Sequence, residues 1–167
     1  ESEFKQIKYL VIQSGTSLKE TTNTGNYSKK RLKDMVKVAK KHKLISKEHN
    51  GDYITTKVIN EKFKLGLDSI NIAPEFGLIE TQTYLDNIKD EKLFDLFYQL
   101  CHDSRRWEKW VDSKFSPIKN KTKLIQICGH YVFSNEIFQT EIKSKLKGID
   151  TKIKKNIKSK LDELFSK

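Results

Sequence analysis

The sequence is poor in cysteine, and its two cysteines form no recognisable metal-binding or redox motif. Cys101 and Cys128 lie far apart, with no CxxC pair and no cysteine–histidine spacing around either of them. Zinc fingers and thioredoxin-like centres need such spacings, so neither is indicated. We interpret both cysteines as free thiols in a reducing compartment.

The sequence also lacks a long hydrophobic run. A membrane-spanning helix needs roughly 18 consecutive apolar residues, and no such stretch occurs. The N-terminal segment ESEFKQIKYLVIQ has neither a basic leader nor a small-residue cleavage site, so a signal peptide is not indicated. We therefore expect a cytoplasmic protein without a membrane partner.

Arginine is scarce although the chain is strongly basic. The net charge is +11, but only three of the 33 Lys and Arg residues are arginine, namely Arg31, Arg105 and Arg106. Recognition of bases and phosphates favours the forked guanidinium group, so nucleic acid is not expected as a partner. The lysines near the C-terminus alternate with apolar residues at helical spacing, which predicts an amphipathic helix with a solvated face.

Apolar runs alternate with helical patterns in the first part of the chain. They predict three strands, at residues 9–12, 44–48 and 69–73. A helix from Lys29 to His42 is predicted with Ser28 as its N-cap, and a second helix follows Thr55 and ends at Gly66. Two consecutive strand–helix–strand units imply parallel strands, so the fold class is α/β.

The pattern changes after Gly77. One long or two short helices are predicted up to Cys101, and residues 105–167 form a helical C-terminal subdomain. We therefore expect βα units at 1–103 and a helical extension at 104–167 that packs on them. Three parallel strands leave a sheet incomplete, and the chain begins with Glu1 rather than Met. The sequence is thus expected to be the C-terminal part of a (β/α)8 TIM barrel.

Several segments together resemble a known family. The quoted segments are VIQSGTS after the first strand, KEHNGDY after the second, LGLD after the second helix, and INIAPEFGLIET, with weaker likeness in RRWEKW and GHYVF. In this order they resemble the class II sugar-bisphosphate aldolase superfamily. The likeness is greatest to the accessory, non-catalytic subunits of tagatose-1,6-bisphosphate aldolase, also described as putative tagatose-6-phosphate kinases.

The resemblance implies a zinc-dependent ancestry. In the catalytic members a zinc ion held by histidines polarises the ketose carbonyl. His49 falls on one zinc ligand and Asn71 on a substrate-contacting asparagine, but Leu18 stands where a second histidine is expected and Asp52 lies in the phosphate loop. Losing an imidazole weakens zinc binding, and a carboxylate repels phosphate. An accessory subunit with an incomplete zinc site is therefore implied, and any activity would be that of a lyase.

The resemblance also implies a remnant or altered sugar-phosphate pocket at the barrel mouth. A sugar phosphate is the expected ligand, and the expected protein partner is a catalytic aldolase subunit or a second copy of the chain. The residues expected to line the pocket follow the three strands: Ser14, Gly15, Thr16, Glu48, His49, Asp52, Tyr53, Asn71 and Glu75.

Structural interpretations of the same residues stay open. Ser14 to Thr16 fit an ordinary turn after a strand, and Glu48, His49 and Asp52 fit a hydrogen-bond cluster that closes the barrel mouth. A different class of function is also open, in which the chain is a non-enzymatic assembly or polyanion-binding module that uses its C-terminal lysines.

Overall fold

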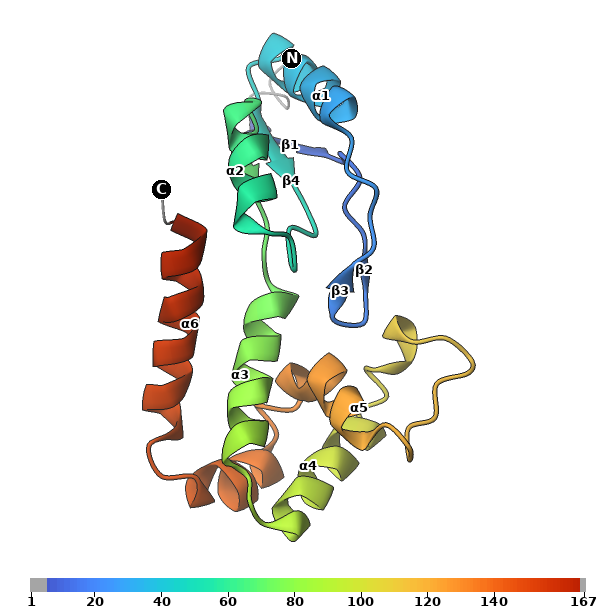
Figure 1. The fold of residues 1–167 in the computed structure, drawn as a ribbon, viewed down its shortest axis with the longest axis vertical. Coiled ribbons are helices and arrows are strands. Elements are labelled where there is room, and N and C mark those ends of the chain that lie inside the picture. The colour runs from blue at the N-terminus through green and yellow to red at the C-terminus, as the bar shows by residue number, and fades with distance from the viewer. Residues whose placement is uncertain (1–5, 166–167) are drawn as a thin grey trace. The chain divides into compact units, whose positions relative to one another are not determined.

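The computed structural model describes residues 6–165, and the chain divides into two compact units. The N-terminal unit ends at Ala73 and the C-terminal unit begins at Pro74. All strands of the described residues lie in the N-terminal unit (Figure 1). The division precedes the boundary at 103 and 104 expected from the sequence, because α3 (Pro74–Asn87) and α4 (Glu91–Asp103) pack on helices that follow them.

The N-terminal unit is built on a three-stranded parallel sheet. Its strand order is β1 (Tyr9–Ile12), β4 (Ile45–Glu48) and β5 (Ser69–Ile70). The predicted α/β class and the parallel strands are confirmed, although β5 is shorter than the predicted 69–73. The polar segment after β1 also contains a small antiparallel hairpin that the sequence did not predict, formed by β2 (Leu18–Lys19) and β3 (Thr22–Asn23).

Two helices connect the strands of the sheet. In α1 (Lys29–Lys41) the Ser28 side chain accepts a hydrogen bond from the Arg31 amide, as its predicted N-cap role requires. In α2 (Thr56–Lys64) Thr55 occupies the N-cap position but its side chain makes no capping bond. Gly66 follows α2 with φ +98°, a left-handed conformation that favours glycine and ends the helix. The core of the unit consists of Ile12, Leu32, Val36 and Leu67, with partly buried neighbours around them.

One face of the sheet carries no covering layer among the described residues. Along β1 the buried Ile12 alternates with Tyr9 and Val11, which keep 50% and 53% of their surface exposed. Ile45, the register partner of Tyr9, is 41% exposed, whereas its neighbour Ser46 is buried. Because side chains alternate between the two faces of a strand, these exposed residues share the face opposite the core with Lys47, whose Nζ lies 5.7 Å from the Tyr9 ring centroid.

The C-terminal unit is helical, as predicted for residues 105–167. Beyond α3 and α4 its elements are η2 (Glu108–Trp110), α5 (Lys121–Cys128), η3 (Gly129–Tyr131), the π-helix η4 (Phe138–Ile142), η5 (Lys143–Lys145) and α6 (Ile149–Phe165). Phe138 lies at the centre of the core, with its ring centroid 5.0 Å from that of Tyr84 and 5.1 Å from that of Phe97. The aromatic rings of three separate elements therefore join the helices.

Two further expectations concern this unit. Cys101 and Cys128 are both free thiols, and both are buried in the core. In α6, Ile149 and Ile153 are buried while the lysines around them are exposed, so the helix is amphipathic. Among residues 6–165, none of the helices has the length and apolar character needed to cross a membrane.

The uncovered face of the sheet predicts binding of a dye that fluoresces on apolar surfaces. We expect the double substitution Val11→Lys and Ile45→Lys to remove most of the dye fluorescence, because both side chains lie on that face. Val38→Lys with Phe63→Lys is the matched control, since these residues are similarly exposed but lie on helices. Equal loss of fluorescence in both double variants would contradict the assignment of the face.

Candidate functional site

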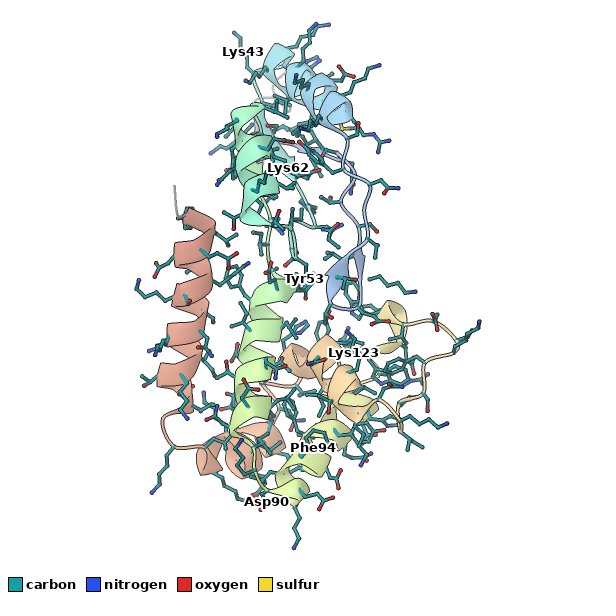
Figure 2. All side chains as sticks on the ribbon, in the orientation of Figure 1. Lys43, Tyr53, Lys62, Asp90, Phe94 and Lys123 are labelled. Carbon is teal, nitrogen blue, oxygen red and sulfur yellow. The ribbon has the colours of Figure 1, made fainter. Side chains whose placement is uncertain are left out.

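A pocket of about 220 Å³ lies in the N-terminal unit, beside the polar segments that follow β1 and β4. Hydroxyl, amide and phenol groups supply most of its polar lining, and α2 begins at its edge. In Figure 2, Lys62 is labelled on α2 and Tyr53 on the segment that precedes this helix. The lining residues are Gly15, Thr16, Asn23, Gly25, Tyr27, Tyr53, Ile54, Thr55, Val58 and Lys62.

A buried ion pair supports one wall of this pocket. The Lys62 Nζ lies 2.6 Å from the Glu48 Oε2, and neither side chain has any exposed surface. Lys62 also donates to the Ser14 Oγ at 2.7 Å, while the Ser14 amide donates to the Glu48 Oε1 at 2.6 Å. The Ser14 hydroxyl donates to the same carboxylate oxygen. Each buried charge therefore has an opposite charge and further hydrogen bonds, as burial of an ion pair requires.

An aromatic ring completes the surroundings of the lysine. The Lys62 Nζ lies 4.3 Å from the centroid of the Tyr27 ring, within the range of a cation–π contact. Burial, followed by the nearby Glu61 carboxylate, raises the pKa of Tyr27 to about 12. The phenol therefore stays protonated at neutral pH and presents a neutral hydroxyl group to its surroundings.

Hydrogen bonds to backbone carbonyls tie the loops after the strands together. The Thr16 hydroxyl donates to the His49 carbonyl at 2.7 Å, and the Asn23 amide group donates to the Asn50 and Asp52 carbonyls at 2.9 and 3.0 Å. The Gly51 amide donates to the Asn71 carbonyl at 2.9 Å. Segments that are far apart in the sequence are thus joined by hydrogen bonds at the carboxyl ends of the strands.

Backbone conformation in these loops is unusual. Asn50 and Tyr53 have φ values of +57° and +58°, in the left-handed region that costs a non-glycine residue about 1–2 kcal/mol. Gly15 has φ +111°, and a Cβ atom there would clash with the Asn26 carbonyl. A Cβ atom at Gly25 would in turn clash with the Gly15 carbonyl. Both glycines are therefore required where the two arms of the loop cross closely.

Only some of the residues predicted from the sequence line the pocket. Gly15, Thr16 and Tyr53 line the pocket, and Ser14 and Glu48 form the ion-pair network behind it. Asp52 is buried and its Oδ1 accepts a hydrogen bond from the Ala73 amide, whereas the His49 and Asn71 side chains are exposed and outside the lining. Glu75 belongs to the C-terminal unit, where it lies 2.9 Å from the Lys160 ammonium group.

Lys62 is the residue that sequence reasoning missed. It stands three positions after the buried Ile59, on the apolar stripe of α2, where a lysine is unexpected. A lysine on an apolar stripe was the sign in the sequence that Lys62 could be buried, but such a lysine is difficult to recognise in a chain that contains so many lysines. Asn23 and Tyr27 were also missed, because the segment that contains them was predicted only as a long polar loop.

A metal site is not assembled by the described residues. Between residues 6 and 165, no three His, Cys, Asp or Glu side chains lie close enough together to bind a metal ion. A zinc ion at His49 would therefore need ligands from outside this part of the chain, since zinc takes three or four protein ligands.

Comparisons with known proteins give a likeness in fold. No protein-family model and no curated protein matches the sequence. A solved structure, that of a probable tagatose 6 phosphate kinase from Sinorhizobium meliloti 1021, matches with a TM-score of 0.60 and 14% identity. The match covers 97% of this chain and 48% of that one, so the chain spans about half the length of its structural neighbour. At this identity the likeness shows the fold alone.

The buried ion pair predicts a large effect of a single substitution. Lys62→Met should lower the free energy of unfolding by about 3–5 kcal/mol, because it leaves the Glu48 carboxylate buried without its counter-charge. Urea denaturation followed by circular dichroism measures this change. Lys64→Met is the control, since Lys64 lies on the exposed side of α2 and its loss should change stability by less than about 0.5 kcal/mol.

A second variant separates loss of charge pairing from loss of packing. In Glu48→Gln with Lys62→Met, the amide oxygen still accepts from Ser14 but no buried charge remains. This double variant should therefore be more stable than Lys62→Met alone. Wild-type stability of Lys62→Met, or a double variant less stable than the single one, would contradict the role assigned to the pair.

Proposed function

We propose that this chain is part of a sugar-phosphate-handling protein of the class II aldolase type, in which it acts as an accessory, non-catalytic subunit. The observation that carries the proposal is the polar pocket beside the carboxyl ends of β1 and β4, in an α/β fold shared with a probable tagatose 6 phosphate kinase. Ligands of parallel α/β folds bind at this end of the strands.

The pocket offers groups suited to a phosphorylated sugar. Thr16, Tyr53 and Thr55 place hydroxyl groups on its wall, and hydroxyl-rich ligands need several hydrogen-bonding partners. Thr55, the N-cap residue of α2, lines the pocket, so the N-terminus of this helix lies at the edge of the pocket. A helix N-terminus favours an anion, so the phosphate would lie near Thr55. Lys62 is neutralised by Glu48 and would shape the wall rather than bind the phosphate.

We also propose that the sheet is the last part of a (β/α)8 barrel. In such a barrel the helices cover the outside and the opposite face of each strand packs in the interior. The face that carries Tyr9, Val11, Ile45 and Lys47 lies opposite the core formed with α1, as interior positions of a barrel would. A structural neighbour of about twice the length supports further strands over this face.

An accessory role fits the chemistry of the site better than catalysis. Class II aldolase chemistry needs a metal-bound carbonyl, and the resemblance places Leu18 where one of the zinc-binding histidines is expected. The Asp52 carboxylate is bonded to the Ala73 amide, so it serves the loop structure rather than a reacting group. Stabilisation of a separate catalytic chain requires only that the fold and its surface persist.

Ketose phosphates provide the test of ligand binding. A ketohexose 6-phosphate at about 100 times its Kd should stabilise the chain by about 2.7 kcal/mol, measured as a rise in Tm with and without zinc. We expect Tyr53→Phe and Thr55→Ala, which remove hydroxyl groups from the pocket lining, to reduce this rise, and Tyr9→Phe and Thr151→Ala, outside the lining, to keep it as matched controls. A Tm that no ketose phosphate raises would end the proposal. Binding that disappears with added salt and with loss of the α6 lysines would instead favour the polyanion-binding module.

Mixing experiments provide the test of the accessory role. A catalytic tagatose-1,6-bisphosphate aldolase chain should lose activity more slowly on heating when this chain is present, because a partner that binds only the folded state stabilises it. The half-life of activity at fixed temperature is the measurement, with serum albumin as the control protein. The same half-life with this chain as with albumin would contradict the role.

A further inference from the structure

Positive charge is concentrated on one helix of the N-terminal unit. Residues 29–43, which comprise α1 and the turn after it, contain eight Lys and Arg residues and one acidic residue, Asp34. These fifteen residues therefore carry an excess of seven positive charges, out of a net charge of +11 for the whole chain. All eight basic side chains are exposed, and Figure 2 labels Lys43 just beyond α1. We call Lys30, Lys33, Lys37 and Lys41 the α1 lysine row.

The packing of α1 fixes the direction in which the row points. Leu32, Val36 and Ala39 form the buried stripe of the helix. The four lysines of the row follow one another in steps of three or four residues, so they lie along the opposite side of the helix over about 16 Å. The outer side of a helix is convex and cannot enclose a small ligand. An extended anionic partner is therefore the kind that reaches all four lysines.

Carboxylates of the chain offset other charges of α1 but not those of the row. Lys29 lies 2.7 Å from the Glu61 carboxylate. Hydrogen bonds from Ser46 and, to a smaller extent, the charge of Lys40 lower the pKa of the Asp68 carboxyl. Within residues 6–165, no carboxylate forms an ion pair with a lysine of the row. The charge of the row is thus available to a molecule outside this part of the chain.

The charges of α1 lie where they oppose helix stability. The first turn begins with the basic residues Lys29–Arg31 and contains no acidic residue, although the helix dipole favours acidic side chains there. Lys37 is four residues from both Lys33 and Lys41, a spacing at which like charges repel each other. An anion bound to the row would offset this repulsion. Local stability therefore does not account for the charges, whereas an anionic partner does.

The lysines of the C-terminal helix α6 differ from those of α1. They alternate with three acidic residues of the same helix. Lys158 lies 2.8 Å from Asp162, and Lys160 lies 2.9 Å from Glu75 of α3. Part of the charge of α6 is thus neutralised within the C-terminal unit, so α1 is the better surface for an anionic partner.

We propose that the α1 lysine row is a docking surface for a membrane that carries anionic lipids. Clusters of four or more lysines on a helix attract such a surface, whose headgroups present a plane of negative charge. Val38 keeps 50% of its surface exposed on α1, and an apolar side chain gains from contact with lipid. Peripheral docking of this kind needs no membrane-spanning segment. It also does not rest on the proposed function.

Nucleic acids and acidic proteins fit the row less well. Recognition of nucleic acid favours forked guanidinium groups and stacking aromatic rings, but α1 contains one arginine, Arg31, and no aromatic residue. Lysine is depleted in protein–protein interfaces relative to the rest of the surface. A lipid surface has neither requirement, because it attracts point charges through its overall negative potential.

Sedimentation with lipid vesicles tests the proposal. The chain should bind vesicles of phosphatidylcholine that contain phosphatidylglycerol, at an ionic strength of about 0.1 M, and added salt should weaken this binding. Vesicles of phosphatidylcholine alone should leave the chain in the supernatant. Equal binding to both kinds of vesicle would overturn the proposal, because contact would then depend on apolar surface such as the uncovered face of the sheet.

Two quadruple variants remove the same charge from different helices. Replacing the α1 lysine row by glutamine should weaken vesicle binding by about a hundredfold or more. The control should weaken it by less than about tenfold, and it replaces four exposed lysines of α6 in the same way. The control substitutions are Lys152→Gln, Lys154→Gln, Lys155→Gln and Lys158→Gln. Equal weakening in both variants would indicate attraction by net charge alone and would overturn the assignment.

Folding of the α1 variant is checked separately. Its Tm should be no lower than that of the wild type, because the substitutions remove repulsion between exposed side chains. A single substitution tests the row in the opposite direction. Asp34→Asn removes the acidic residue of α1 and should tighten vesicle binding by about fivefold, whereas Glu136→Gln in the C-terminal unit should not. No tightening with Asp34→Asn would contradict the proposal.

A short DNA duplex separates a membrane from a nucleic acid as the partner. At equal concentrations of accessible phosphate, the chain should bind the anionic vesicles more tightly than the duplex. Tighter binding to the duplex, lost in the α1 variant, would overturn the assignment to a membrane and identify a nucleic acid as the partner.

Discussion

The N-terminal unit depends on one buried ion pair. Glu48 ends the central strand of the sheet and Lys62 lies on α2, the helix that follows this strand, and neither side chain is exposed to water. Removing two charges from water is costly, so the surroundings must satisfy them from several directions. Ser14 does so through its amide and its hydroxyl, which brings the loop after β1 to the end of β4. The position of the pocket follows from this geometry.

The loops around the pocket are positioned by hydrogen bonds that backbone carbonyl groups accept. Thr16 and Asn23 use their side chains to reach carbonyls of the loop after β4, and the loop after β5 adds an amide–carbonyl bond at Gly51. Because backbone carbonyls accept these hydrogen bonds, the shape of the pocket wall depends little on which side chains the loops expose. His49 and Asn71, the residues most suggestive of chemistry, are accordingly the ones that the fold leaves in solvent.

Much of the fold was predictable because it rests on local patterns. The apolar run at Tyr9–Ile12, the cap at Ser28 and the left-handed glycine at Gly66 each have one favoured conformation, and the structure confirms them. The site was less predictable because it depends on pairs of residues distant in sequence. A lysine such as Lys62 is predicted to be exposed to solvent as long as its partner is unknown. The close approach of Gly15 and Gly25 cannot be predicted from the residues around either glycine.

The edge strand of the sheet affects how the polypeptide folds and assembles. Within residues 6–165, β1 is an outer strand, and its sequence YLVI is apolar on both faces. A bare strand of this kind is a template onto which strands of other molecules add, the first step of many aggregation reactions. Tyr9–Ile12 must therefore be covered before it meets the same strand of a second molecule. Correct assembly thus depends on the rate at which this strand is covered as well as on the stability of the assembled state.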